Sequence, residues 1–434
     1  MEEVPQNLLL NPGATVPQSK HFGIPLLSHL HLNGGASGVS AFDIFGESSV
    51  DINTRIRNKI FEMKNTDFFT FTQQLELLNV GWRSKNDIYF SGGIYEEIDF
   101  ITYFPRDLAI LAWEGNRDYL DYPFDLGEIS LTGDVLTVYH FGANKELSKK
   151  LTVGVRAKLY SSMINFSSTN NRGTFTTSLD TDGVNIYDHT IADADITVNT
   201  SGYIPLRELD GAGEVTSTIL GRAFFGGNLG VGVDLGATYQ LTDRITTTAS
   251  VLDFGAIFHT KDVENYNASG TYNLNGIELI FPPLGEGEAT IPYYDNIEDE
   301  FEAEIPVDTL KVNASLEYGF GSVFGRDECD CLNMGANKDW VQAIGAQFYS
   351  IFRPKGPQMA GTVYYRRRIH ENLSAKATYT IDSYSATNLG LGIVADLGKI
   401  NFYIAADNLV RYTNLAKAKS VSLQLGFNVK IDEE

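Results

Sequence analysis

The feature that most constrains the fold of this chain is a two-residue alternation of apolar and polar side chains. In the stretch NLGLGIVADLGKINFYIAADNL, residues 388–409, every second residue from Leu389 to Leu397 is apolar, and residues such as Gly390 and Asp396 lie between them. A period of two is typical of a β-strand with one apolar and one polar face. The same period returns in segments that begin near residues 151, 229, 310 and 421.

Marking every segment of this kind predicts fourteen strands with short or long connections between them. Residues 184–201 and 262–275 also look strand-like, and we expect them to extend hairpins within long loops. The predicted strands are 21–36, 69–83, 87–103, 133–147, 150–166, 227–241, 244–261, 308–321, 338–352, 358–370, 372–385, 387–398, 400–412 and 418–431.

The connections are sorted by length along the chain. Long loops (37–68, 104–132, 167–226 and 262–307) alternate with tight turns, apart from the insert 322–337. This sorting is typical of a barrel with turns on one rim and long loops on the other, as in outer-membrane barrels with periplasmic turns. The predicted fold is therefore an all-β, transmembrane, antiparallel up-and-down barrel. Its domains are a short N-terminal periplasmic or plug segment (1–20), one barrel (21–431) and a tail (432–434).

The polar strand faces carry charges of both signs, which a dry core would tolerate poorly. A wet or ion-paired lumen accommodates them, so the apolar face is predicted to contact lipid. No apolar run approaches the length of a membrane helix. The alternative is a large soluble β-sandwich or barrel with the apolar face as its core. The predicted lumen-facing residues are Arg156, Lys158, Asp234, Lys311, Glu317, Lys376, Asp382 and Asp396.

Two non-strand segments in the long loops are predicted to be helical. Residues 50–63 place apolar side chains on one helical stripe, and residues 105–116 form a short apolar helix after a proline. They are candidates for a hatch over the lumen; alternatively, they pack together as a surface cap. The hatch candidates are Ile52, Ile56, Ile60, Leu108, Leu111 and Trp113.

Charge restricts the partners of this chain. The formal net charge is −22, so nucleic acid is excluded as a partner, because its recognition needs a basic face. Acidic residues gather near 295–304. Such a run is usually a solvated segment, and the alternative is a patch that binds divalent cations or docks a partner.

Motifs for chemistry are weak. The DECDC insert holds Asp327, Cys329, Asp330 and Cys331, which are candidate ligands for a soft metal but lack a second Cys or His pair. His140 is the one histidine that invites a catalytic interpretation, and it has no local partner motif. We therefore expect no enzymatic activity and no cofactor.

The start MEEVPQNLLLNPG lacks the basic and apolar regions of a signal peptide. Because the strand pattern points to a membrane barrel, we interpret the chain as a mature form without its signal peptide. Outer-membrane lipid is then an expected partner.

The segments VPQNLLLNPGA and HFGIPLLSHLHLNGGASG resemble the start of a Bacteroidetes outer-membrane family known as DUF5723. KKLTVGVRAKLYSS, NLGVGVDLGATYQLTDRITTTASVLDFGAI and ATNLGLGIVADLGKINFYIAADNL resemble it as well, in the same order, from about residue 5 to 430. That family is similar to FadL-like barrels, which include fatty-acid channels and a shuttle barrel of the type IX secretion system. The resemblance implies fourteen strands and residence in the outer membrane.

Two function hypotheses follow. The first is a non-enzymatic barrel that acts as a subunit or accessory of a multi-protein envelope complex for secretion or outer-membrane assembly. The alternative is a FadL-like channel for uptake of small hydrophobic molecules, with a lipid-like molecule in its lumen. A membrane hydrolase is a minor third option.

Overall fold

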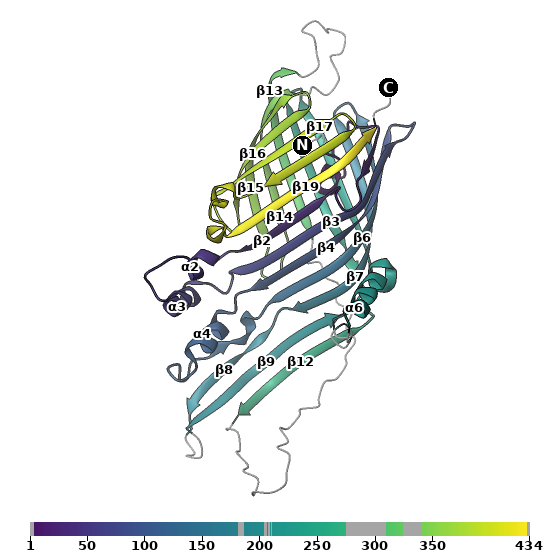
Figure 1. The fold of residues 1–434 in the computed structure, drawn as a ribbon. Helices are drawn as coiled ribbons and strands as arrows, with labels where there is room; N and C mark the ends of the chain where they lie inside the picture. The colour runs from purple at the N-terminus through teal and green to yellow at the C-terminus, as the bar shows by residue number, and fades with distance from the viewer. Residues whose placement is uncertain are drawn as a thin grey trace.

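The computed structural model describes residues 4–180, 186–203, 206, 209, 211–274, 310–323 and 340–431. Within these residues, β-strands form one long, tilted structure with a few short helices at one end (Figure 1). No helix among them is long and apolar enough to cross a membrane.

The strands close into a 14-stranded antiparallel barrel. Two short strands, β1 and β2, share one position in it, because both pair with β19 on one side and with β3 on the other. The wall strands are β1 (Lys20–Gly23), β2 (Leu30–Ala36), β3 (Phe68–Arg83), β4 (Ile88–Tyr103), β6 (Leu131–Ser148), β7 (Leu151–Ser168), β10 (Asn228–Thr242), β11 (Ile245–Ile257), β13 (Lys311–Val323), β14 (Trp340–Ile351), β15 (Gln358–His370), β16 (Leu373–Asp382), β17 (Asn388–Leu397), β18 (Ile400–Ala406) and β19 (Ser420–Ile431).

The predicted fold class is thereby confirmed, and most strand bounds agree with prediction within a few residues. The first strand is the exception. Residues 24–29 leave the ladder between β1 and β2, and we call them the wall break. They contain Pro25, which has no N–H for the ladder, and Leu26, whose φ is 65°. Leu26 and Leu27 are exposed.

Four further strands continue the wall at one end of the barrel. β9 (Tyr187–Ser201) pairs with the last residues of β7, with β8 (Arg172–Leu179) and with β12 (Val263–Leu274), while β5 (Phe124–Asp125) pairs with β8. The strand-like segments 184–201 and 262–275 are therefore β9 and β12, as predicted. We call this the long-loop end of the barrel, and the opposite end, with turns such as 149–150, the short-turn end (Figure 1).

The helices are short. Apart from one in the N-terminal segment, they belong to connections at the long-loop end. The predicted helix at 50–63 is α3, which Asp51 caps by accepting hydrogen bonds from two backbone N–H groups. The bounds are α1 (Asn7–Leu10), α2 (Ala41–Phe45), α3 (Ile52–Glu62), α4 (Arg106–Glu114) and α6 (Ala212–Gly221), with a π-helix η2 (Arg222–Gly226) and the short 3₁₀ turns η1 (Leu126–Glu128), η3 (Leu409–Arg411) and η4 (Leu415–Lys417).

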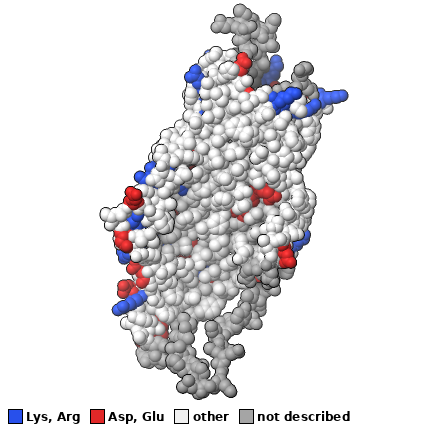
Figure 2. Space-filling view, in the orientation of Figure 1, with Lys and Arg blue, Asp and Glu red and all other residues white. Residues whose placement is uncertain are grey.

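The apolar strand faces point outward. On β17, Leu389 and Leu391 are 43% and 41% exposed, whereas Asn388 and Gly390 are buried toward the lumen. Leu235 at the middle of β10 is likewise exposed. On the face shown in Figure 2, charged side chains gather toward the ends and edges and most of the broad central surface is uncharged. This pattern is that of a lipid-facing barrel surface.

Candidate functional site

The N-terminal segment runs through the inside of the barrel. Residues 4–19, which we call the plug, contain one short helix, α1, and no barrel strand. Val4, Leu8, Ala14 and Val16 are buried. The predicted segment 1–20 thus includes a plug that occupies the lumen.

Side chains of the wall hold the backbone of the plug. Asn144 on β6 donates to the carbonyl oxygens of Pro12 (2.7 Å) and Ala14 (2.8 Å). Ser250 on β11 donates to the carbonyl of Leu10 (2.7 Å). A buried segment without regular pairing needs such partners, because unpaired backbone groups are costly away from water.

Arg156 on β7 receives the end of α1. Its guanidinium donates to the carbonyl oxygens of Leu8 and Leu9, at 2.9 Å each. The last carbonyls of a helix have no partner within the helix, and they carry a partial negative charge. A buried cation at this point donates hydrogen bonds to these carbonyls and balances their partial negative charge. Arg156 therefore connects the plug to the wall.

Two wall glycines allow the plug backbone to pass close to the strands. A Cβ atom on Gly154 would overlap the backbone of Pro12 and Gly13, and a Cβ on Gly236 would overlap Asn11 and Pro12. Only glycine leaves this space at both positions. The wall is therefore shaped for this segment.

The other end of the plug binds the wall beside the wall break. Gln6 donates to the Glu76 carboxylate (2.9 Å) and exchanges two amide hydrogen bonds with Asn428 (2.8 and 2.9 Å). Glu76 is fully buried and also accepts from Asn79 (2.7 Å). Ser28 and the other inward residues of the wall break are buried in the same region.

Four of the predicted lumen residues form one buried ionic network around the plug. Arg156 binds Asp234 (2.5 Å), and Asp234 also lies 3.1 Å from the ammonium of Lys158. Lys158 pairs in addition with Asp253, which accepts from Lys311 (2.9 Å). The structure thus brings Arg156, Lys158, Asp234 and Lys311 together through Asp253. Paired charges of this kind tolerate burial that isolated charges do not.

Some ion pairs cross the lumen. Lys311 on β13 binds Glu97 on β4 (3.0 Å), and Arg353, after β14, binds Asp99 on β4 through both carboxylate oxygens. These strands are not neighbours: several strands separate them in either direction around the barrel. Opposite walls are therefore joined by charged side chains that cross the lumen.

At the long-loop end, other connections cross the mouth. Lys355, in the turn between β14 and β15, donates to the carbonyls of Asn65 (3.1 Å) and Glu128 (3.0 Å), which belong to loops on the other side. Burial lowers the pKa of Lys355, and the nearby Glu128 carboxylate opposes that shift. Tyr384, from the turn after β16, packs edge-on against Phe68.

The other predicted lumen charges lie apart from this network. Glu317 binds Arg366 (2.8 Å) and accepts from Tyr364 (2.9 Å). Lys376 places its ammonium 3.7 Å from the centre of the Tyr364 ring. These residues form a second polar group on the wall from β13 to β16.

Asp382 and Asp396 lie at or next to the ends of β16 and β17, apart from both polar groups. Asp382 accepts from the backbone N–H of Ser385 (2.7 Å) and so stabilises a turn, as aspartate often does. Asp396 pairs with Lys430 near the short-turn end.

The hatch candidates form a surface cap. α3 and α4 contact each other, and Arg57 pairs with Glu114 across them (2.5 Å). Ile52 and Trp113 are exposed, and Ile56, Ile60, Leu108 and Leu111 are only partly buried. The two helices thus pack together near the surface, and a hatch role for these residues stays a prediction.

Several predictions lie outside the described residues. The candidate metal ligands Asp327, Cys329, Asp330 and Cys331, the insert 322–337 from residue 324 onward and the acidic run near 295–304 belong to this group. Among the residues that the structure does describe, no cluster of three or more His, Cys, Asp or Glu residues has metal-binding geometry.

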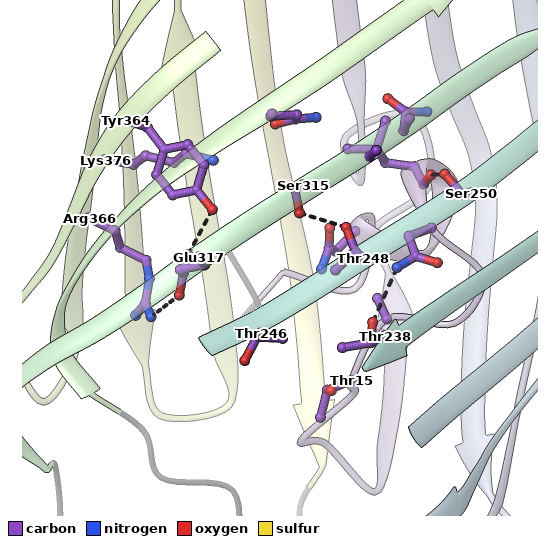
Figure 3. A pocket seen from close by; sticks show the side chains of 17 residues that line it. Thr15, Thr238, Thr246, Thr248, Ser250, Ser315, Glu317, Tyr364, Arg366 and Lys376 are labelled. Carbon is purple, nitrogen blue, oxygen red and sulfur yellow. Dashed lines mark hydrogen bonds and ion pairs between the residues drawn. The ribbon is translucent and has the colours of Figure 1, made fainter. Parts of the chain in front are cut away.

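A cavity of about 140 Å³ lies between the plug and the wall from β10 to β16. We call it the plug pocket (Figure 3). Most of the side chains that line it are polar. They are Asn7, Leu10, Asn11, Ala14 and Thr15 of the plug, with Thr238, Thr246, Thr248, Ser250, Asn313, Ala314, Ser315, Glu317, Gln347, Tyr364, Arg366 and Lys376 of the wall.

Residues that sequence reasoning missed include Glu97, Asp99 and Asp253 in the strands and Arg353 in a turn. For Glu97 and Asp99 a signal existed, because their spacing puts them on one strand face with Tyr95. No local pattern distinguishes Arg353, since its role depends on a partner from the opposite wall.

These features define a plugged transmembrane β-barrel with an ion-paired lumen. Residues 12–407 match the model of the family described as "Family of unknown function (DUF5723)". The chain belongs to this family, which confirms the membership predicted from the sequence.

Among solved structures, the chain is similar to toluene transporters and to a FadL homologue. The Ralstonia pickettii toluene transporter TbuX has a TM-score of 0.42 and 11% identity, over 98% of this chain and 94% of that one. The P. putida toluene transporter TodX has a TM-score of 0.43 and 11% identity, over 98% of this chain and 93% of that one. A Pseudomonas aeruginosa FadL homologue has a TM-score of 0.40 and 9% identity, over 99% of this chain and 94% of that one. No curated protein matches the sequence.

Proposed function

We propose that this chain is a small-molecule channel of the bacterial outer membrane, in which the plug closes the lumen. The observation that carries the proposal is the way residues 4–19 are held. Side chains of the wall bind the plug backbone through a few separate hydrogen bonds, and no ladder of strand pairing joins the plug to the wall. Such contacts can be exchanged one by one for water, so the plug can leave without unfolding the wall.

This proposal follows the channel alternative of the two sequence hypotheses. In the envelope-complex hypothesis, the acidic run and the DECDC insert would be docking surfaces, and both lie outside the described residues. It stays a prediction, as does an association with type IX secretion. The polar lining of the plug pocket argues against a hydrocarbon as the molecule held there.

Arg156→Met provides the test, because Arg156 connects the plug to the wall. The variant should increase the flux of small solutes into proteoliposomes. The matched control is Arg353→Met, which removes a buried cation that pairs with Asp99 and is not hydrogen-bonded to the plug in the described structure. The control should leave solute flux near that of the unmodified protein.

A cross-link shows whether the plug is the moving part. Asn11 of the plug lies 3.2 Å from the Thr238 hydroxyl (side-chain nitrogen to oxygen), so cysteines at both positions can be oxidised to a disulfide. In the Arg156→Met background, with Cys329 and Cys331 replaced by Ser, oxidation should suppress the flux and a reductant should restore it. Cysteines at Thr248 and Ser315, which join two wall strands, are the control. Flux unaffected by the plug cross-link would refute the gate.

A further inference from the structure

Residues 212–226, which comprise α6 and η2, attach to the outside of the barrel, and Figure 1 shows α6 at its side. We call them the α6–η2 segment. Lys158 of β7 points into the lumen, so Ser161, at an odd spacing from it, points outward. The Ser161 hydroxyl donates to the carbonyl of Arg222 in η2 (2.6 Å), and η2 also contacts β6 and β10. This part of a long loop therefore returns to the outer face of the wall.

Further contacts hold the α6–η2 segment in place. The buried Arg222 guanidinium binds Asp262 (2.6 Å). Tyr139 of β6 donates to the carbonyl of Ala223 (2.9 Å) and stacks on the Phe225 ring, with ring centroids 4.3 Å apart. Phe225 has a φ of 65°, a left-handed conformation that is costly for an aromatic residue and persists only where the surroundings hold it. The outward position of the segment is thus built into the fold.

The free surface of the α6–η2 segment is largely apolar. Phe224 is 64% exposed, and Leu220 and Phe225 are exposed as well. The structure describes every residue of the segment, and Glu214 is the one exposed charged side chain among them. No residue of α6 is buried. A helix at a water-exposed surface normally buries its apolar side, so apolar groups left open in this way indicate an interaction surface.

The level of the segment on the wall identifies what it contacts. Ser161 pairs with Leu229, the first exposed apolar residue of β10, and exposed apolar residues continue along that strand to Leu241. Exposed charges begin just beyond this level, at Lys261, whose ammonium lies 3.2 Å from the carbonyl oxygen of Gly226. The segment therefore lies at the edge of the apolar belt. Outer-membrane barrels have aromatic side chains at this edge, where the acyl chains meet the headgroups.

From this position we infer that the α6–η2 segment is an anchor in the membrane interface, with Phe224 and Leu220 among the acyl chains of the lipid just below the headgroups. Val215, Ile219 and Leu220 share one side of α6, and Glu214 lies on the opposite side. A helix with this division lies in the plane of the interface. The anchor fixes the loop before β10 at one height on the membrane. This inference goes beyond the proposed channel function and does not depend on it.

Other surroundings fit the segment less well. In water, large apolar side chains would stay exposed directly beside a wall that lipid covers. A partner protein, or a second copy of this chain, would have to displace the lipid that reaches Leu229 at the same level. Lipid needs no such exchange, because the apolar belt continues into the segment.

Brominated lipids test the inference, because bromine quenches tryptophan fluorescence at short range. Trp82→Phe, Trp113→Phe and Trp340→Phe remove the native tryptophans, and Phe224→Trp then supplies the single reporter. The protein is reconstituted in phosphatidylcholine vesicles with bromine either near the headgroup end or near the terminus of the acyl chains. Bromine near the headgroup end should remove most of the Phe224→Trp fluorescence, and bromine near the chain terminus should remove clearly less.

Two reporters at other positions calibrate the depth. Leu235→Trp, at the middle of β10, should be quenched most by bromine near the chain terminus. Leu179 is exposed at the end of β8, away from the apolar belt, so Leu179→Trp is the matched control. It should be quenched by acrylamide in the water and by neither brominated lipid. Heat-dependent gel mobility checks that each variant is folded.

Leu220→Trp is a second reporter in the anchor and should behave as Phe224→Trp does. Quenching of both by acrylamide alone would place the segment in water and overturn the inference. Protection from acrylamide and from both brominated lipids would mean that protein covers the segment, which would overturn it as well. The assay measures no flux, so either outcome would leave the proposed channel function standing.

Discussion

At the scale of single residues, the molecule depends on charges that are buried but paired. Asp234 has no exposed surface and serves both Arg156 and Lys158. A buried ion pair does not necessarily make a protein more stable than apolar side chains in the same place would. Removing one partner is nevertheless costly, because the other charge stays buried without compensation.

Asp234→Asn should therefore destabilise the barrel by about 3–5 kcal/mol. The comparison is Asp195→Asn, which breaks the exposed pair with Arg172 and should cost about 1 kcal/mol or less. Urea unfolding from lipid vesicles measures both. Equal costs would mean that water screens the network around Asp234 in the lumen.

His259 gives the fold a pH dependence at the long-loop end, outside the wall strands. Its Nδ1 lies 2.9 Å from the Ser201 hydroxyl, and burial lowers its pKa from 6.5 to about 4. Between these two values the unfolded chain binds a proton that the folded chain does not, so stability rises with pH. Acidification from pH 7 to pH 4 should cost up to about 3 kcal/mol through this residue.

The unfolding free energy at several pH values tests this. His259→Gln should have a shallower dependence between pH 6.5 and pH 4 than the unmodified protein. His370→Gln, at an exposed histidine at the end of β15, should retain the full dependence. If His259→Gln changed the unfolding free energy by the same amount at every pH, the titration of His259 would have no part in the pH dependence.

At the scale of elements, the strands and an N-terminal segment outside the wall could be predicted, whereas the way the plug is held inside the barrel could not. Each wall strand has one face toward apolar surroundings and one toward the lumen. This asymmetry produces the alternation of apolar and polar residues in the sequence. The plug has no such asymmetry, since it is surrounded by wall. Its place depends on distant partners such as Asn144 and Arg156. The wall break did carry a signal, because Pro25 interrupts a predicted strand.

The fit of the plug against β7 gives a prediction about an element. Gly154→Val places a side chain where the backbone of Pro12 and Gly13 lies, so the plug must move away from β7. Overpacking of this kind costs about 1–3 kcal/mol. We expect higher solute flux and faster cleavage of residues 4–19 by proteinase K.

Gly361→Val is the matched control, since a Cβ at Gly361 on β15 would meet no atom within 4 Å. It should change neither flux nor cleavage. If Gly154→Val also left both unchanged, the plug would have to accommodate the new side chain in place, and the close approach would not define its position.

At the scale of the whole molecule, one alternation determines two surfaces. The outward residues form an apolar belt, and the inward residues form an ion-paired, plugged lumen. The sequence could assign the two faces because charged side chains share only one of them. It could not determine which charges pair, because partners such as Lys311 and Glu97 lie on opposite walls and are distant in the chain.

The last prediction concerns the outer surface of the barrel. Leu235 is exposed at the middle of β10, and Leu241 is exposed near the short-turn end of the same strand. If lipid covers this face, an arginine costs about 2–4 kcal/mol near the bilayer midplane and about 0–1 kcal/mol near its edge. Leu235→Arg should therefore destabilise the barrel in lipid vesicles far more than Leu241→Arg. Water on this face would make both changes nearly neutral, and a protein core would make both costly, so the ratio of the two costs separates a bilayer from either alternative.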